Sequence, residues 1–284
     1  MIRLRPRDPL FPERLRAIFD PPPALYLRGG GETELLGMRA VAVVGARSCS
    51  PYGAQVARML GRELAAAGIV VVSGLARGID GEAHRGALEG GGLTLAVLGC
   101  GIDRDYPASH AQLSRRIEER GLIVSEYEPG VEPAPWRFPA RNRIIAGLSE
   151  AVVVVEARDR SGALITADFA LDEGREVFAV PGEITSTLSA GTNALLKLGA
   201  APLTSTDDVL DALGIERRPQ AAAVEVSPAA QQLLELVREG SAGADELAAR
   251  GKLDAGVISA ALTELELAGL VAAADGVYRA ESSP

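Results

Sequence analysis

The sequence predicts an α/β protein with a doubly wound, Rossmann-like and mainly parallel sheet, followed by a small winged-helix-like domain. Between residues 39 and 213, short Val-rich runs alternate with amphipathic stretches of helical length. Runs that are apolar at every position are typical of strands buried on both faces, as parallel strands between two helical layers are. The 284 residues are enough for one large domain and one small one.

The strands and helices of the large domain can be assigned in order along the chain. The first strand is expected at residues 41–44, and a turn at Gly45 leads into a helix at 52–67 that Gly68 ends. Further strands are expected at residues 69–73, 93–98, 123–124, 151–155 and 177–180. Further helices are expected from the turn at 74–78 through residue 88, near 109–120 and at 164–173. This alternation is that of a doubly wound sheet.

The remaining segments indicate the domain boundaries. Residues 1–39 are too few for a core of their own and are expected to form an N-terminal arm packed on the sheet of residues 40–214. Residues 215–227 mix proline, alanine and polar residues and are expected to be a linker. Residues 228–284 hold three short helical patterns followed by a hairpin pattern, which predicts a winged helix.

The composition excludes several classes of protein. No apolar run reaches about 18 residues, so no membrane span is expected. The N-terminal residues lack the apolar core of a signal peptide. Cys49 and Cys100 stand far apart without a CxxC motif, so neither a disulfide framework nor a zinc site is expected. A cytoplasmic location is therefore predicted.

One segment reverses the sign of the chain's charge. The formal net charge is -9, yet Arg137, Arg141 and Arg143 fall within seven residues, together with Trp136 and Phe138. Guanidinium groups bind phosphate bidentately and stack on planar rings, and aromatic faces take unpaired bases at about 1–3 kcal/mol each. The cluster therefore indicates a ligand with phosphates and bases. A solvated basic turn is the alternative, and Phe138 could equally belong to the core.

Four turns at the carboxyl ends of predicted strands could hold that ligand, because ligands of open α/β sheets bind there. They lie at residues 45–48, 73–78, 156–166 and 181–193. Glycines in these turns let the backbone approach a ligand, and the helix N-termini that follow favour anions. The turns predict phosphate binding, although βα turns also need glycine for geometry alone.

Signs of catalysis or of a bound cofactor are few. The first turn lacks G-x-G-x-x-G and no P-loop motif is present, which disfavours a nicotinamide or nucleotide-hydrolysing enzyme. His84 is interpreted as a structural or surface residue. Carboxylates near strand ends could form a metal site but are common without one: Asp80, Asp103, Asp105 and Glu126. We predict no catalytic residues, no metal and no cofactor.

Several stretches, in order, resemble the DprA (also called Smf) family of DNA-processing proteins. They cover nearly the whole central domain: Val43 to Arg47, Ser73 to Asp80, Phe138 to Leu148, Ser161 to Ala167, and Val177 to Gly182 leading into Gly191, Thr192 and Asn193. Parts of the arm, from Phe11 to Leu15 and from Asp20 to Gly29, are also similar to the family.

The resemblance implies binding of single-stranded DNA without sequence preference, and delivery of that strand to a RecA-type recombinase during DNA uptake. It also implies a homodimer without nuclease or polymerase activity. The predicted DNA-binding residues combine cations for phosphates, hydrogen-bond donors and one ring for base stacking: Arg47, Gly74, Arg77, Gly78, Arg137, Phe138, Arg141, Asn142, Arg143, Ser161, Gly162, Thr192, Asn193 and Lys197.

The chain departs from the family pattern at both ends. Many relatives begin with a small helical domain, which is expected to be trimmed or absent here. Residues 227–284 carry nine acidic and four basic residues, and the predicted recognition helix at 254–268 has no Lys or Arg. Such a face repels phosphate, so a protein-contact or regulatory role fits this module better than groove binding.

Two other classes of protein remain as alternatives. The Pro181-Gly182 and Gly191-Thr192 pairs loosely resemble the phosphate loop of nucleotide phosphoribohydrolases, although eight residues separate the two pairs and Asn193 follows where a catalytic carboxylate is expected. A protein scaffold without nucleic-acid contact would agree with the acidic pI of about 5.0. It would not need arginines gathered with aromatic residues.

Overall fold

The computed structural model describes residues 1–215, 226–240, 242–251, 253–274 and 276–280. The chain divides into two compact units, Met1–Arg217 and Arg218–Pro284, and each is described by itself. Most of the predicted linker at 215–227 lies outside the described residues.

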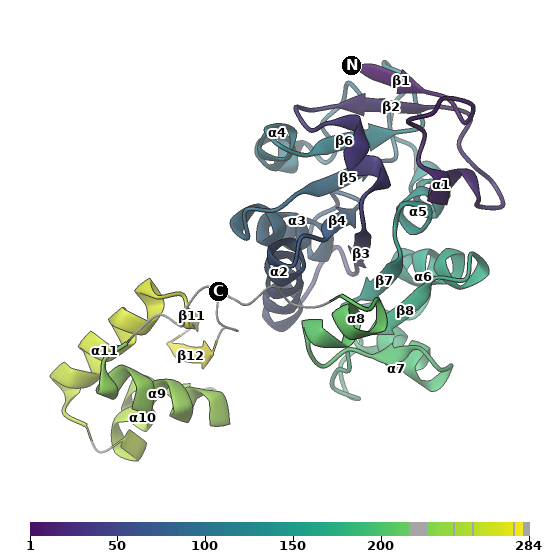
Figure 1. Ribbon diagram of the computed structural model, residues 1–284. Coiled ribbons are helices and arrows are strands. Elements are labelled where there is room, and N and C mark those ends of the chain that lie inside the picture. Colours follow the sequence, from purple (N-terminus) through teal and green to yellow (C-terminus); the bar gives the residue numbers. More distant parts are fainter. Residues whose placement is uncertain (216–225, 241, 252, 275, 281–284) are drawn as a thin grey trace. The chain divides into compact units, whose positions relative to one another are not determined.

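The first unit is built on a nine-stranded sheet in the order β1-β2-β6-β5-β4-β3-β7-β8-β9 (Figure 1). All neighbouring strands from β6 to β9 pair in parallel, whereas β2 pairs antiparallel with β6 and with β1. The strands are β1 (Ile2–Leu4), β2 (Leu25–Arg28), β3 (Ala40–Val44), β4 (Val70–Ser73), β5 (Thr94–Leu98), β6 (Leu122–Ser125), β7 (Ala151–Val154), β8 (Glu176–Ala179) and β9 (Ala201–Pro202). The predicted fold class is confirmed.

Both faces of the sheet are covered by helices, as the Val-rich runs require. The helices of this unit are α1 (Glu13–Arg16), α2 (Pro51–Ala66), α3 (Ile79–Glu89), α4 (Ala111–Glu118), α5 (Arg137–Leu148), α6 (Gly162–Asp172), α7 (Ala190–Lys197) and α8 (Thr206–Ala212), with short 3₁₀ turns at Thr33–Gly37 and Ala108–His110. Among the described helices of both units, none is long and apolar enough to cross a membrane.

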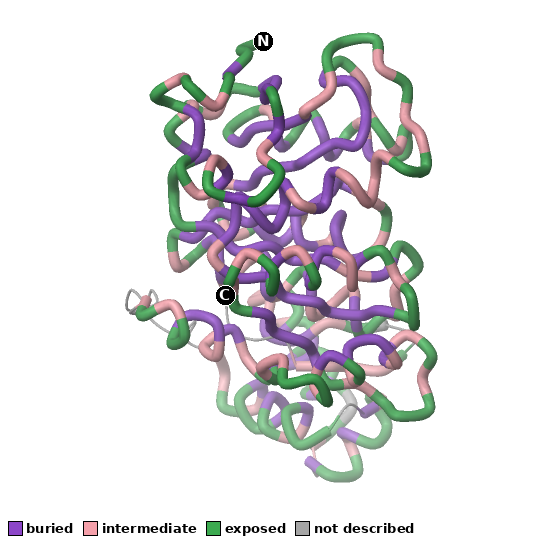
Figure 2. The backbone as a smooth tube through the Cα atoms, turned by 90° about the vertical axis from the view of Figure 1, so that its right-hand side faces the viewer, coloured by how far each residue is buried: buried purple, intermediate pink, exposed green. Residues whose placement is uncertain are grey.

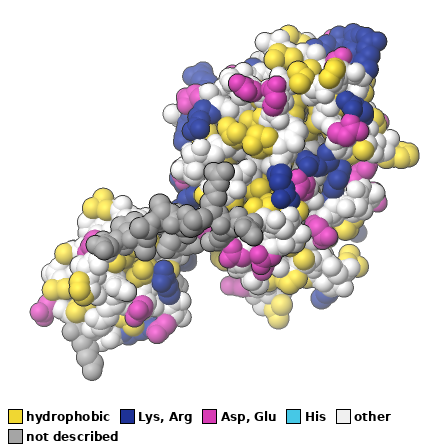
Figure 3. All heavy atoms as spheres, in the orientation of Figure 1, with side chains coloured by type: hydrophobic (Ala, Val, Ile, Leu, Met, Phe, Trp, Pro, Cys, Tyr) yellow, Lys and Arg dark blue, Asp and Glu magenta, His cyan; other side chains and the backbone are white. Residues whose placement is uncertain are grey.

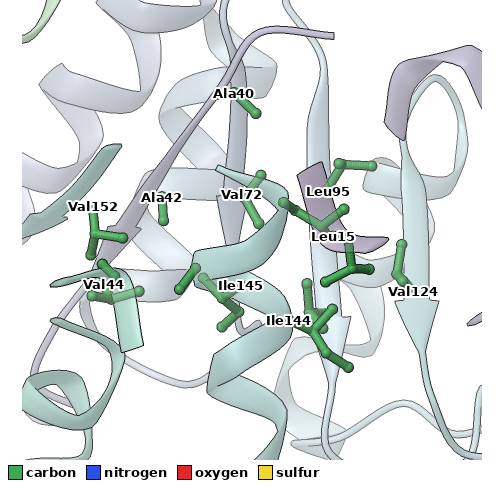
Figure 4. Packing of buried hydrophobic residues seen from close by; sticks show 14 of the residues in the cluster. Leu15, Ala40, Ala42, Val44, Val72, Leu95, Val124, Ile144, Ile145 and Val152 are labelled. Atoms are coloured by element: carbon green, nitrogen blue, oxygen red, sulfur yellow. The ribbon is translucent and has the colours of Figure 1, made fainter. Parts of the chain in front are cut away.

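Alternate residues of each strand belong to opposite cores. In β3, Ala42 and Val44 pack with α5 and α6, while Val41 and Val43 pack with α2 and α3. Figure 4 shows the first core, in which Ile144 and Ile145 of α5 meet β3 and β5. The central strands β3, β4, β5, β6 and β7 are buried along their whole length, whereas β1 and β9 at the two edges are partly exposed. Figure 2 draws the buried residues in purple. This two-sided burial follows from the period of two along a strand.

The predicted arm at residues 1–39 supplies the antiparallel edge of the sheet. It contributes β1 and β2, and its helix α1 buries Leu15 completely against the core that contains α5. Arg14 fastens it further, since its Nη2 lies 2.7 Å from a carboxylate oxygen of Glu150. The arm is therefore part of the sheet domain rather than a strap on its surface.

The second unit has the winged-helix elements that were predicted. Three helices, α9 (Pro228–Glu239), α10 (Ala244–Gly251) and α11 (Ala255–Leu267), enclose a small core of their own. A three-stranded sheet completes it, with β12 (Val277–Ala280) between β10 (Ala242–Gly243) and β11 (Val271–Ala274). Ser227 caps α9, and Glu264 of α11 accepts hydrogen bonds from its backbone N–H (2.7 Å) and its hydroxyl (2.6 Å).

Candidate nucleic-acid interface

A cavity lies where the strand order of the sheet reverses. The chain builds β3, β4, β5 and β6 outward in one direction and β7, β8 and β9 in the other, so the reversal falls between β3 and β7. Loops diverge at such a point and leave a crevice at the carboxyl ends of the strands. Here a cavity of about 460 Å³ is lined by the turn after β3 and by the start of α6. A second, of about 380 Å³, shares Arg47, Ala76, Tyr106, Phe138 and Arg141 with it.

Backbone hydrogen bonds join three of the four predicted turns at this cavity. The N–H of Ile79 donates to the carbonyl of Ala46 at 3.2 Å, and the N–H of Ala46 donates to the carbonyl of Glu156 at 2.8 Å. Gly78, the N-cap of α3, has a φ of 77°, and a Cβ there would lie 2.2 Å from the Ala46 carbonyl oxygen. Glycine at 78 thus serves the close approach of two turns.

We expect Gly78→Ala to lower the free energy of unfolding by about 1–2 kcal/mol, because alanine meets both the positive φ and the Ala46 carbonyl. Urea denaturation measures the change. Gly162→Ala is the matched control: Gly162 opens α6 with open space around its Cβ position, so its stability should be unchanged or slightly raised. Equal stability of the two variants would contradict the close-approach argument.

A stacked pair of aromatic rings forms one wall of the cavity. The rings of Tyr106 and Phe138 lie 5.2 Å apart at an interplanar angle of 27°, and the Arg47 guanidinium carbon lies 5.1 Å from the Phe138 centroid. All three side chains line both cavities. Phe138 is therefore a half-buried wall residue and not a member of the core. Tyr106 is not among the residues predicted from the sequence, although its place in the loop after the predicted strand at 93–98, at the same sheet edge, was an available signal.

Three arginines bring positive charge to this wall. Arg47 and Arg77 are exposed, and neither forms an ion pair with a carboxylate in the part of the chain that the structure describes. Arg141 lies beneath them, 4 % exposed, and donates to the Gly74 carbonyl at 2.9 Å. Burial lowers the pKa of Arg141 to about 10, so it stays cationic at neutral pH.

Asp80 is the acidic partner of this buried cation. Its carboxylate accepts hydrogen bonds from the N–H groups of Gly74 (3.2 Å) and Ala76 (3.4 Å). Burial raises the pKa of Asp80, and the positive charge of Arg141 opposes that rise. A Cβ on Gly74 would lie 2.5 Å from an Arg141 nitrogen and 2.7 Å from an Asp80 oxygen. Glycine at 74 therefore leaves room for both charged groups.

Two arginines of the cluster face away from the cavity. Arg143 is held by Glu126 at 2.7 Å and by Asp20 at 2.9 Å, and its side chain is only 11 % exposed. Arg137 donates to the Glu132 carbonyl, and its guanidinium lies over the rings of Tyr127 and Trp136. Neither lines the cavities, so the structure does not bring Arg143 or Arg137 to the phosphate site predicted for them.

The third turn contributes its helix N-terminus to the cavity. Ser161 caps α6 by accepting a hydrogen bond from the N–H of Ala163 at 3.3 Å. Asn142 donates from Nδ2 to the Gly162 carbonyl at 3.0 Å, which ties α5 to this turn. Ser161, Gly162 and Asn142 all line the larger cavity, in agreement with the place predicted for them.

The fourth turn is occupied by contacts within the protein. The Asn193 amide binds the backbone of Gly182 twice, accepting at 3.3 Å and donating at 3.1 Å. Thr192 is buried and donates to the Ser189 carbonyl at 3.2 Å. Lys197 ends α7, about 10 Å along the helix axis from the N-terminal end. These three predicted residues line neither cavity.

The carboxylates that were considered as a metal site hold separate partners. Glu126 pairs with Arg143, Asp105 with Arg28 at 2.7 Å, and Asp103 accepts from the Gly130 N–H at 2.9 Å. Asp80 belongs to the cavity floor beside Arg141. Among the described residues no group of three metal-ligating side chains is present.

The net charge of the chain does not describe this local surface. On the face drawn in Figure 3, basic and acidic side chains lie interspersed over the sheet unit. Several arginines outside the cavity pair with a carboxylate, as Arg28 and Arg39 do. Arg47 and Arg77 at the cavity form no such pair within the described residues, so cations are available there despite the acidic net charge of -9.

Comparison with known proteins gives the same picture for both units. Residues 3–214 match the family model of DNA recombination-mediator protein A, and residues 217–276 match that of the DprA winged helix domain. Protein Smf of Escherichia coli is 42% identical over 279 residues, covering 94% of this chain and 74% of that protein.

Two solved structures are similar to most of this chain. DNA processing protein A from Streptococcus pneumoniae has a TM-score of 0.71 and 45% identity, covering 74% of this chain and 73% of that one. DNA processing protein A from Helicobacter pylori, described for its single-stranded DNA binding mode, has a TM-score of 0.66 and 33% identity, covering 73% of this chain and 94% of that one. With matches to both family models and to these relatives, the chain belongs to the DprA (Smf) family of DNA-processing proteins.

Proposed function

We propose that this protein binds single-stranded DNA without sequence preference through the cavity at the β3–β7 reversal. The observation that carries the proposal is the Tyr106–Phe138 stack beside Arg47, with Arg77 and Arg141 at the same cavity. Aromatic faces accept any base, and cations close to them bind the adjoining phosphates. The binding mode described for the Helicobacter pylori relative supports the same ligand.

The wider role rests on membership of the family. We propose that the protein acts as a homodimer in the cytoplasm, protects incoming DNA and delivers it to a RecA-type recombinase during DNA uptake, without catalysing a reaction itself. The hydrogen bonds between the Asn193 amide and the Gly182 backbone support a role without catalysis. They engage backbone groups of the loop in which a phosphoribohydrolase would hold its substrate.

We expect single-stranded oligonucleotides to bind about tenfold more tightly than duplexes of equal length, because duplex bases are stacked on each other and cannot reach Phe138. Fluorescence anisotropy at matched salt measures both affinities. Equal affinity for the two forms would contradict the proposal. Incubation with AMP tests the enzymatic alternative, and release of adenine would overturn the non-catalytic role.

A further inference from the structure

A second aromatic cluster continues the cavity along the same edge of the sheet. The cavity is lined by the loops that follow β7, β3, β4 and β5, which are neighbours in that order in the sheet. The next strand in the sheet is β6, so the loop after β6 lies beside the loop after β5. Tyr127 stands in that loop. Backbone bonds fasten the two neighbouring loops together: Gly101 N–H to the Val131 carbonyl at 2.8 Å and Ile102 N–H to the Tyr127 carbonyl at 3.3 Å. Tyr106 and Tyr127 are thus carried by neighbouring loops.

The centre of this cluster is a guanidinium that lies over two aromatic rings. The Arg137 guanidinium carbon lies 4.8 Å from the Trp136 centroid and 5.0 Å from the Tyr127 centroid. One nitrogen donates to the Glu132 carbonyl, while Nε is buried without a hydrogen-bond partner among the described residues. The Arg137 guanidinium, which is held by the Glu132 carbonyl, therefore lies against the Trp136 indole and supports it.

Trp136 itself remains open. The residue is 62% exposed, although its indole is a large apolar group that proteins usually bury. It precedes α5 directly, and α5 is anchored in the core by Ile144 and Ile145. An anchored, exposed ring loses little conformational entropy when a flat ligand stacks on it.

We propose that Trp136, backed by Arg137 and Tyr127, is a second base-stacking subsite, so that a bound single strand runs from the Phe138 cavity toward the β6 end of the sheet. The inference rests on the proposed function, since it assigns the path of the same ligand. A base is favoured over a protein partner because the cluster adjoins the cavity and carries a cation next to its exposed ring, which suits the phosphate beside a stacked base.

The indole reports on its own occupancy, since Trp136 is the only tryptophan of the chain. We expect its fluorescence to be quenched by an oligothymidylate about 12 nucleotides long, and not by an abasic oligonucleotide of the same length. Trp136→Ala should weaken oligothymidylate binding about five- to tenfold, and Trp136→Phe should restore most of the loss. Tyr52→Ala, which removes a half-exposed ring from α2, should have no effect.

The outcomes separate this inference from the proposed function. Tight binding without quenching, or with unchanged affinity of Trp136→Ala, overturns the second subsite and leaves single-strand binding intact. Absence of any binding by the wild-type protein overturns both. A shift of the emission that depends on protein concentration without DNA would show that the indole is a protein contact, which also overturns the inference.

Discussion

Phe138→Ala is expected to weaken the binding of single-stranded DNA about 30- to 100-fold, or about 2–3 kcal/mol. The Phe138 ring contacts two side chains: the Tyr106 ring stacks on it, and the guanidinium carbon of Arg47 lies 5.1 Å from its centroid. Removing the ring deletes a base-stacking surface and also the support that positions a phosphate-binding cation. Anisotropy titration with an oligothymidylate measures the loss.

Controls distinguish the loss of stacking from the loss of charge or of folding. Phe138→Tyr keeps the ring and should bind nearly as the wild type does. Phe19→Ala removes a 98% exposed ring from the arm and should leave affinity unchanged. Arg47→Ala should reduce the slope of affinity against salt by about one charge, whereas Phe138→Ala should reduce it less, because the charge of Arg47 is retained. A folded Phe138→Ala protein with less than about threefold weaker binding would remove this ring from the site.

The central strands could be predicted because the burial of a strand on both faces requires apolar residues at consecutive positions, and this pattern is visible in the sequence. Runs such as residues 41–44 and 151–155 are short, rich in Val and apolar at every position, which is typical of a strand covered on both faces. The edge strands β1 and β2 were not predicted, because their pairing depends on tertiary contacts that bring the arm beside β6. Helix α5 was also missed as an element. Pro139 disguises it, yet Pro139 occupies the first turn, where no intrahelical N–H is needed.

The sequence predicts which turns form the site, but it does not predict in which direction the side chains near these turns point. Residues two apart on a helix point about 200° apart, so Arg141 and Arg143 could not both face the cavity. Arg141 turns to the carbonyls of Gly74 and Val97, and Arg143 turns to Glu126. Lys197 lies away from the cavity for a related reason, since a helix that begins at Ala190 carries its last residue away from the loop edge.

His84 is a fully buried residue of α3, which makes it structural rather than a surface residue. Thr94 Oγ1 donates its only hydrogen to the Val71 carbonyl at 2.7 Å, so it accepts from His84 Nδ1 at 2.7 Å. The proton of the neutral ring is thus on Nδ1. His84 Nε2 is buried and has no hydrogen-bond partner among the described residues. Burial, together with the charges of His110, Arg141 and Arg85, lowers the pKa of His84 from 6.5 to about 3.

We therefore expect the protein to lose stability steeply in acid. The folded state binds fewer protons than the unfolded state between the two pKa values, so the free energy of unfolding is unaffected above the unfolded value of 6.5 and falls as pH decreases toward about 3. For this one group the slope is about 1.4 kcal/mol per pH unit, which amounts to about 3 kcal/mol by pH 4.5. Urea denaturation between about pH 7 and pH 4 measures it.

The contribution of His84 is isolated by comparing slopes rather than absolute stabilities. His84→Asn keeps a hydrogen-bond donor near the Nδ1 position but does not titrate. The slope of its free energy of unfolding against pH should therefore be smaller than that of the wild type by about 1.4 kcal/mol per pH unit. The cavity left by the smaller side chain lowers stability equally at every pH and does not change this slope. His110→Asn should flatten the curve less, because the hydrogen bond from His110 to the Leu75 carbonyl at 3.0 Å counteracts the lowering of the pKa of His110 by burial. If His84→Asn does not fold, NMR titration of the wild-type ring gives the same answer. A His84 that titrates near 6.5, or equal slopes for wild type and His84→Asn, would mean that the ring beneath the β4–β5 surface is hydrated and not a buried neutral group.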